Sequence, residues 1–282
     1  MRAVETSETD GATADPRAIR VVALDVDGTL AGADHRVSDR TVDVLRRLVA
    51  RGVVPVVVTG RTEGSARALA DRVGMAAPTI SCNGAVVTDP GGERLSVTVM
   101  DPDEVRRVVA FGREHDEVSA VLWTTTAMLT EHPSPWTDLL AEVNDEPVTT
   151  VPLSGPGAEL PADVVKVMLV GDPDALDALR DEVGRALPAM RRGMAPFFET
   201  SAPGASKREA LRLVLDRLGV DPSACMGIAD GDTDAAWLAE VGLPVAPANA
   251  MAAARQVARH HIGHHADDAV ADFLEQFFSL PR

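Results

Sequence analysis

Two apolar, β-branched runs that flank an amphipathic helix constrain the fold of this chain most. The runs read "IRVVALDV" and "VVPVVVTG", and the helix between them begins after Ser38, a good N-cap, and ends at Gly52. A second helix, "EGSARALADRVG", leads to a third run, "TISCNGA". Strands that alternate with helices, without hairpin signals, pair in parallel with right-handed crossovers and are buried on both faces. The sequence therefore predicts an α/β fold with a doubly wound, Rossmann-like parallel sheet.

This pattern is interrupted near Val86 and returns near Pro196. Looser strands and two helices, starting near Asp101 and Asp172, fill the interval around a polar, proline-rich middle, which suggests a small α+β domain. The buried pattern then resumes with "SKREALRLVLDRLG", "CMGIAD", "TDAAWLAEVG" and a short final strand, "PVAPANA". We expect a disordered tail over 1–17, a core domain formed by 18–86 and 196–282, and an inserted α+β domain over 87–195.

Composition restricts the partners and the compartment. The chain has 27 Lys and Arg against 43 Asp and Glu, and its formal net charge of −16 repels nucleic acids and anionic membranes. Cys82 and Cys225 are far apart and form no CxxC pair, so buried reduced thiols are expected. The sequence shows neither a signal peptide nor a membrane span. We predict a cytoplasmic protein, a monomer or homodimer, that binds neither nucleic acid nor membranes.

Two aspartates, Asp25 and Asp27, close the first apolar run in "ALDVDGTL". Buried carboxylates are costly unless a positive group meets them, and a divalent cation is the simplest one. Ligands of open parallel sheets bind at the carboxyl ends of the strands, where this "DGT" turn is expected. Thr59 ends the next run in "VVVTGR"; its hydroxyl can donate to an anionic oxygen, and Gly60 permits close backbone approach.

Lys207 and an acidic turn complete the set of unusual charges. A lysine in the first turn of a helix opposes the helix dipole, so an anionic group nearby would explain Lys207. The stretch "IADGDTDAAWL" places Asp230, Asp232 and Asp234 before a helix. An EF-hand calcium loop is excluded, because the glycine and glutamate that it needs are missing. An acidic turn remains that can hold a hard cation.

Five short stretches follow one another along the chain: "DVDGTL", "VVVTGR", "SCNGA", "SK" and "ADGDTD". Together and in this order, they resemble the motifs of the haloacid dehalogenase-like (HAD) phosphatase superfamily, specifically its Cof-like branch, subfamily IIB. The resemblance covers a HAD core from about 19 to 86 and from about 197 to the end. In this branch, the domain inserted after the Asn-Gly turn is a cap, a lid that contacts the leaving group.

The resemblance implies a Mg²⁺-dependent phosphomonoesterase for a small phosphorylated metabolite, with a sugar phosphate as the expected substrate. Asp25 would be the nucleophile that forms an aspartyl-phosphate. Asp27 would act as the general acid and then as the base. Thr59 and Lys207 would hold the phosphoryl oxygens.

The metal and binding residues follow from the same resemblance. Mg²⁺ would be held by Asp25, the backbone carbonyl of Asp27 and Asp230. Asp234 would support the metal directly or through a water, and Asp232 would be a solvated turn residue. The other phosphate or substrate contacts would come from Gly28, Gly60, Arg61, Asn83, Gly84 and Thr233.

Departures from the family pattern leave two alternatives open. The acidic stretch "ADGDTD" has Ala229 for Gly and Thr233 for Asn, and Pro247-Ala248 replaces the Met-Gly that is usual in the family. The shorter Thr233 hydroxyl replaces an amide that is expected to contact the phosphate. The alternatives are phosphoryl transfer to a sugar hydroxyl, as in a mutase, and a degenerate member that binds a phosphorylated ligand without turnover.

Two further groups of side chains stand out. An aromatic ring beside a cation suits a sugar or a second anionic group, so the cap candidates for leaving-group contacts are Trp123, His132, Trp136, Arg191 and Arg192. A solvated loop before the last helix is expected to hold the clustered histidines, His260, His261, His264 and His265.

Overall fold

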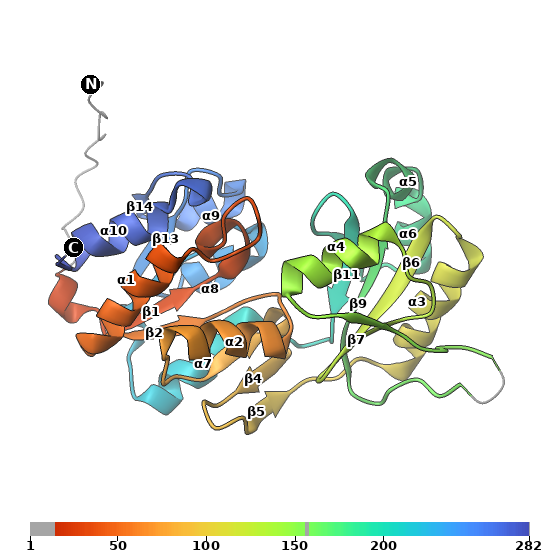
Figure 1. Cartoon of the computed structure of the whole chain (residues 1–282), viewed down its shortest axis with the longest axis horizontal. Coiled ribbons are helices and arrows are strands. Elements are labelled where there is room, and N and C mark those ends of the chain that lie inside the picture. The colour runs from red at the N-terminus through yellow and green to blue at the C-terminus, as the bar shows by residue number, and fades with distance from the viewer. Residues whose placement is uncertain (1–14, 156–157, 282) are drawn as a thin grey trace.

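The chain forms two bodies that lie side by side, each built around its own sheet (Figure 1). The computed structural model describes residues 15–155 and 158–281, so most of the predicted tail over 1–17 lies outside the described residues. Both ends of the described part of the chain belong to the first body, and its middle forms the second. The second body is therefore an insertion into the first.

The first body is built on a parallel sheet with the strand order β14-β13-β12-β1-β2. Its strands are Val21–Leu24 (β1), Val54–Val57 (β2), Cys225–Ile228 (β12), Leu243–Ala246 (β13) and His260–His261 (β14). Alternate residues of β1 point to opposite faces. Val22 and Leu24 pack in one hydrophobic cluster, whereas Val21 and Ala23 pack in another.

Helices cover both faces of this sheet. One face carries α1 (Asp39–Ala50), α2 (Glu63–Val73) and α10 (Ala269–Phe277). The other carries α7 (Lys207–Leu218), α8 (Ala235–Leu238) and α9 (Ala252–Val257). Ser38 caps α1 as expected, since its hydroxyl accepts from the backbone of Thr41 at 3.1 Å. The predicted doubly wound parallel sheet is confirmed.

The third predicted strand pairs differently from the expectation. The strands Thr79–Ser81 (β3), Val86–Thr88 (β4) and Arg94–Val97 (β5) form an antiparallel sheet of their own. β3 runs parallel to the end of β2, with which it shares the bridge between Val58 and Ile80. Cys82 and Asn83 then adopt positive φ angles of 50° and 58°, which turn the chain back against β3. β4 and β5 thus lie beside the core, although most of their residues fall within 87–195, the range expected for the inserted domain.

The second body is a mixed sheet with the order β10-β11-β9-β6-β7-β8. Its strands are Val118–Thr124 (β6), Met128–Thr130 (β7), Val148–Thr150 (β8), Val164–Gly171 (β9), Arg191–Arg192 (β10) and Phe197–Ser201 (β11). One face packs on Pro102–Glu114 (α3), Pro173–Ala178 (α5) and Arg180–Ala186 (α6). The other face packs on Pro135–Asn144 (α4) and on the turn around Cys82, so it lies toward the first body. The expected inserted α+β cap is present.

Two local predictions were wrong. The proline-rich middle contains α4, which begins with a capping box at Ser134 and buries Leu140 and Val143. The histidine cluster is not a solvated loop throughout, because His260 and His261 form β14 and extend the sheet beyond β13. A two-residue edge strand leaves too short an alternation to be read from the sequence.

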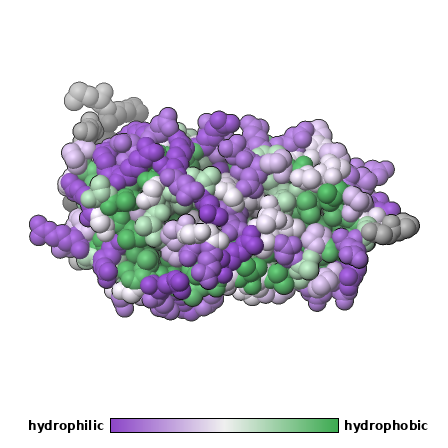
Figure 2. All heavy atoms as spheres, turned by 60° about the horizontal axis from the view of Figure 1, so that its bottom comes forward, coloured by the Kyte–Doolittle hydropathy of each residue, from purple (hydrophilic) through white to green (hydrophobic). Residues whose placement is uncertain are grey.

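The remaining bulk properties are unremarkable. Cys82 and Cys225 are buried and free, as expected, and burial raises the pKa of each thiol to about 12. Among the described residues, no helix combines the length and the apolar character needed to cross a bilayer. On the face shown in Figure 2, hydrophilic residues surround smaller hydrophobic areas, as expected when most apolar side chains are packed inside.

Candidate active site

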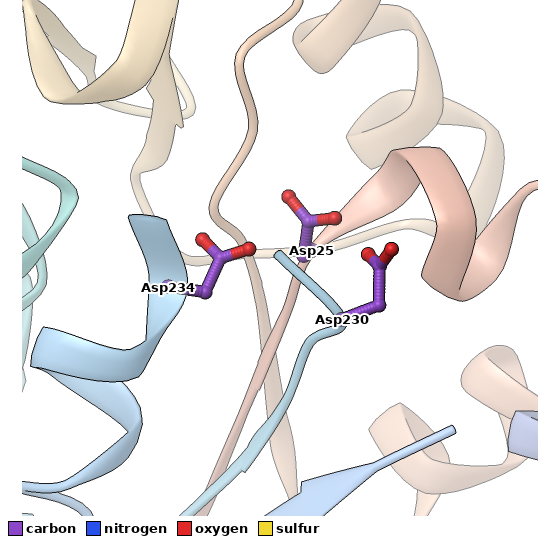
Figure 3. A group of neighbouring side chains, drawn as sticks. All are labelled: Asp25, Asp230 and Asp234. Atoms are coloured by element: carbon purple, nitrogen blue, oxygen red, sulfur yellow. The ribbon is translucent and has the colours of Figure 1, made fainter. Parts of the chain in front are cut away.

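Three carboxylates meet at the carboxyl ends of two neighbouring strands (Figure 3). Asp25 follows β1, whereas Asp230 and Asp234 follow β12, its partner in the sheet. The backbone N–H of Asp25 donates to the carbonyl of Ile228 at 3.0 Å, which continues the pairing of the strands to their ends. One oxygen of each carboxylate lies within 4.8 Å of the others. The parallel sheet thus joins the stretches "DVDGTL" and "ADGDTD" in one site.

The turn after β1 is shaped around Asp230. Gly28 has a φ of 74°, and a Cβ there would lie 2.3 Å from Oδ2 of Asp230, so only glycine fits. The hydroxyl of Thr29 donates to Oδ1 of Asp230 at 3.0 Å. From outside the predicted set, Asn249 donates from Nδ2 to the Gly28 carbonyl at 2.8 Å. In this structure Gly28 therefore serves the placement of Asp230.

Lys207 is the buried cation of the cluster. It occupies the first position of α7, and its Nζ donates to Oδ1 of Asp25 at 2.7 Å and to Oδ1 of Asp234 at 2.8 Å. Burial alone would lower the pKa of Lys207, but the charges of Asp234 and Asp25 outweigh burial and raise it. Asp234 also accepts from the indole nitrogen of Trp237 at 2.9 Å. The anionic neighbours that Lys207 required are these two aspartates.

One lysine does not balance three carboxylates. Burial raises the pKa of Asp25 well above its ordinary value, and the charges of Asp234 and Asp230 add to this against the opposing charge of Lys207. Burial likewise raises the pKa of Asp230 to about 6. Mg²⁺ in proteins is bound by oxygen ligands, chiefly carboxylates. The cluster offers carboxylate oxygens and carries more negative than positive charge, so its residues fit the expected Mg²⁺.

Asp27 lies in a different arrangement, paired with Arg61. The guanidinium donates from Nε to Oδ2 of Asp27 at 2.9 Å and from Nη2 to Oδ1 at 2.6 Å. Burial would raise the pKa of Asp27, but hydrogen bonds with His35 and Arg61 lower it to about 2. The carboxylate is thus ionised at neutral pH, and Arg61, predicted to contact substrate, is engaged with Asp27.

A cavity of about 190 Å³ lies between the two bodies. The predicted residues that line it are Asp25, Asp27, Gly60, Arg61, Asn83, Lys207, Asp230, Thr233 and Asp234. Gly28, Thr59 and Gly84 are not among its lining residues. Thr59 is fully buried, and its hydroxyl accepts from the Arg61 backbone at 3.1 Å. A Cβ on Gly84 would lie 2.3 Å from the Ser206 carbonyl carbon, so Gly84 lets the turn between β3 and β4 pass close to the start of α7.

The cap side of the cavity differs from the candidates chosen from sequence. Of the five, Trp123 lines the cavity; His132, Trp136, Arg191 and Arg192 do not. Sequence reasoning missed Lys166 on β9 and Glu199 on β11, which line it as an ion pair with an N–O distance of 2.6 Å. A signal was present: Lys166 is the one charge within the apolar run "VVKVMLV", and a buried charge needs a partner.

Comparisons with known proteins agree with this fold. The chain matches the haloacid dehalogenase-like hydrolases over residues 22–274, and it belongs to this family. An HMP-PP phosphatase from Cronobacter sakazakii is 28% identical over 93% of this chain and 97% of its own length. A 5-amino-6-(5-phospho-D-ribitylamino)uracil phosphatase from Bacillus subtilis is 27% identical over 92% of this chain and 98% of its own.

Solved structures place the fold in the same group. A haloacid dehalogenase-like hydrolase from Bacteroides thetaiotaomicron superposes with a TM-score of 0.81 at 23% identity, covering 92% of this chain and 100% of that one. The family predicted from the motifs is confirmed by the match over residues 22–274. The names of the two curated relatives agree with the predicted enzyme class, a phosphomonoesterase.

Proposed function

We propose that this chain is a Mg²⁺-dependent phosphatase that hydrolyses a small phosphorylated metabolite through an aspartyl-phosphate on Asp25. The observation that carries the proposal is the cluster at the sheet edge, where Lys207 bridges Asp25 and Asp234 beside Asp230. The relatives named as phosphatases of small phosphorylated compounds support the same class of substrate. A sugar phosphate remains the substrate that we expect.

The chemistry divides into two half-reactions. In the first, an oxygen of Asp25 attacks phosphorus, the bond from phosphorus to the ester oxygen breaks, and protonated Asp27 gives its proton to that oxygen. In the second, a water attacks phosphorus, Asp27 takes a proton from the water, and the bond from phosphorus to Asp25 breaks. Inorganic phosphate leaves, and both carboxyl groups return to their starting states.

The charges of the site support this division. Lys207 stays protonated and supplies positive charge for the phosphoryl oxygens. Mg²⁺ would be held by Asp25, the backbone carbonyl of Asp27 and Asp230, with Asp234 in support directly or through a water; when bound, it would let an anionic nucleophile meet an anionic phosphate. Because its pKa is lowered, Asp27 is ionised at neutral pH, which is the form that can take a proton from water in the second half-reaction. For the acid half it must first take up a proton, which a nearby phosphate dianion favours by raising its pKa.

Replacing Asp25 by Asn tests the nucleophile. We expect phosphate release from p-nitrophenyl phosphate in Mg²⁺ to fall by roughly a thousandfold or more, since removal of a covalent nucleophile has effects of this size. Asp232→Asn, an exposed carboxylate of the acidic turn, is the matched control and should retain activity. Activity retained by a folded Asp25→Asn variant would refute the assignment. Phosphate release without an added sugar would exclude a pure mutase, and any Mg²⁺-dependent turnover would exclude a non-catalytic binder.

A further inference from the structure

The charges that line the cavity bear on which leaving group it accepts, an inference that rests on the proposed phosphatase function. Among the described residues, the lining carboxylates are Asp25, Asp27, Glu199, Asp230 and Asp234, and the lining cations are Arg61, Lys166 and Lys207. Every one of these three cations is already paired with a carboxylate of the same lining. The pairs of Arg61 and Lys207 belong to the core side, where the phosphoryl group would react.

Lys166 is the cation that the cap contributes. Its side chain is 4% exposed, and its Nζ lies 2.6 Å from Oε2 of Glu199 and 4.3 Å from the ring centroid of Trp123. The same Nζ donates to the carbonyl of Gly60 at 3.4 Å. The positive charge of Lys166 is therefore met within the cavity wall by the carboxylate of Glu199, the face of the Trp123 ring and the Gly60 carbonyl.

Glu199 keeps this pair neutral. Burial would raise the pKa of Glu199, but the charge of Lys166 lowers it below its ordinary value, so the carboxylate is ionised. Its side chain is 28% exposed, so it is more accessible than Lys166. A ligand that enters from the cap side thus meets the negative partner of the pair more readily than the positive one.

The rest of the cap-side wall offers no compensating charge among the described residues. Leu140, Val143, Met168 and Phe197 are apolar. Asn144 is engaged at both ends, since its Oδ1 accepts from the backbone of Thr62 at 3.2 Å and its Nδ2 donates to a backbone carbonyl at 2.9 Å. A second anion bound in this part of the cavity would therefore give up hydration and face the carboxylate of Glu199, and like charges repel each other.

We propose that the substrate is a phosphate monoester whose leaving group carries no second negative charge, and that Glu199 is the specificity-determining residue because it neutralises Lys166. An uncharged polyol, sugar or heterocycle satisfies this condition. Leaving groups that carry a carboxylate or a further phosphate do not. The sequence suggested that a cap cation beside an aromatic ring would bind either a sugar or a second anionic group. Because Glu199 neutralises Lys166, we expect the uncharged group and not the anionic one.

A pair of matched esters tests the selectivity of the wild-type protein. 4-Carbamoylphenyl phosphate and 4-carboxyphenyl phosphate have nearly the same shape and differ in the charge of one group. We expect kcat/KM for phosphate release in Mg²⁺ to be at least about tenfold higher for the carbamoyl ester, since juxtaposed like charges disfavour the other. Equal values, or a preference for the carboxylate, would overturn the inference.

Glu199→Gln tests the assigned residue by a gain of activity. The variant keeps the shape of the side chain but leaves the charge of Lys166 uncompensated, so kcat/KM for the carboxyphenyl ester should rise at least about tenfold. The readout is the ratio of kcat/KM for the carboxyphenyl ester to kcat/KM for the carbamoyl ester, which should rise in the variant. Glu182→Gln, which removes an exposed carboxylate of α6 in the cap, is the matched control and should keep the wild-type ratio.

The outcomes are distinguishable. An unchanged ratio in Glu199→Gln, with a thermal unfolding transition like that of wild type, would overturn the role of Glu199. If the variant fails to fold, the wild-type ratio alone decides the substrate class. Absence of Mg²⁺-dependent phosphate release from both esters by wild type would instead overturn the proposed phosphatase function on which the inference rests.

Discussion

Replacing Asp230 by Asn should stabilise the metal-free protein at neutral pH. The carboxylate is largely buried beside Asp25 and Asp234, and burial is the main cause that raises its pKa from 3.8 to about 6. A raised pKa means that the folded state binds more protons than the unfolded state between about pH 4 and pH 6. The free energy of unfolding of the metal-free wild type therefore falls as pH rises through this window.

The size of the effect follows from the shift. About two pKa units correspond to about 3 kcal/mol at 25 °C, an upper value for a group that keeps some contact with water. Asp230→Asn removes this cost above about pH 6 and leaves stability unchanged below about pH 4. For a chain of this size, such a change raises the melting temperature by about 6 to 12 °C. The Oδ1 atom of asparagine can still accept the hydrogen bond from Thr29, so the substitution removes the charge of residue 230 and keeps this hydrogen bond.

Thermal unfolding in EDTA and in Mg²⁺, at pH 4 and pH 7, measures the effect. Wild type should gain stability from Mg²⁺ at pH 7, because the cation binds the folded cluster, and Asp230→Asn should gain much less. The control is Asp232→Asn in the same turn; the exposed Asp232 accepts a hydrogen bond from Ala253 N–H at 2.8 Å, which asparagine can also accept. The reasoning fails if Asp230→Asn is no more stable than this control in EDTA at pH 7.

Two other substitutions test backbone geometry and the second ion pair. Gly84→Ala should destabilise the protein by at least about 2 kcal/mol in chemical denaturation, because φ is 89° and the new Cβ would meet the Ser206 backbone; an unchanged midpoint would contradict this close approach. Arg61→Met removes a partner that helps to lower the pKa of Asp27 to about 2, a pair whose stabilisation is present above about pH 4 and lost as pH falls through 2. Denaturation should show Arg61→Met less stable than wild type by up to about 2 kcal/mol at pH 6, and this difference should fall to about 0.4 kcal/mol or less near pH 2. A difference as large at pH 2 as at pH 6 would refute the assignment.

The core of the site was accessible from sequence because its parts are tied to strand ends. Asp25 closes one buried strand and Asp230 follows another, and parallel strands bring their carboxyl ends to the same edge of a sheet. Lys207 was detectable for a related reason, since its place in the first turn of α7 is unfavourable without an anion nearby. In each case a local cost in the sequence indicated that a partner had to exist.

The identity of each partner was less accessible. Arg61 was expected to contact substrate but is held by Asp27, and Thr59 is buried behind the loop that carries Arg61. Gly84 was expected near the phosphate, whereas it serves the crossing of two chain segments. These differences depend on side-chain directions and on distances of a few ångströms, which motif spacing does not specify.

The sequence by itself determined the parallel core, the inserted domain, the family and the cluster of Asp25, Asp230 and Lys207. Hydrophobic periodicity, the ends of strands and charged residues at unfavourable positions are properties of short segments, so they can be recognised in the sequence alone. Only the tertiary structure decided that Lys166 meets Glu199 across two antiparallel strands of the cap, facing the core. That pairing depends on strand register and on how the cap sheet lies against the core, which are set by packing between residues far apart in the chain.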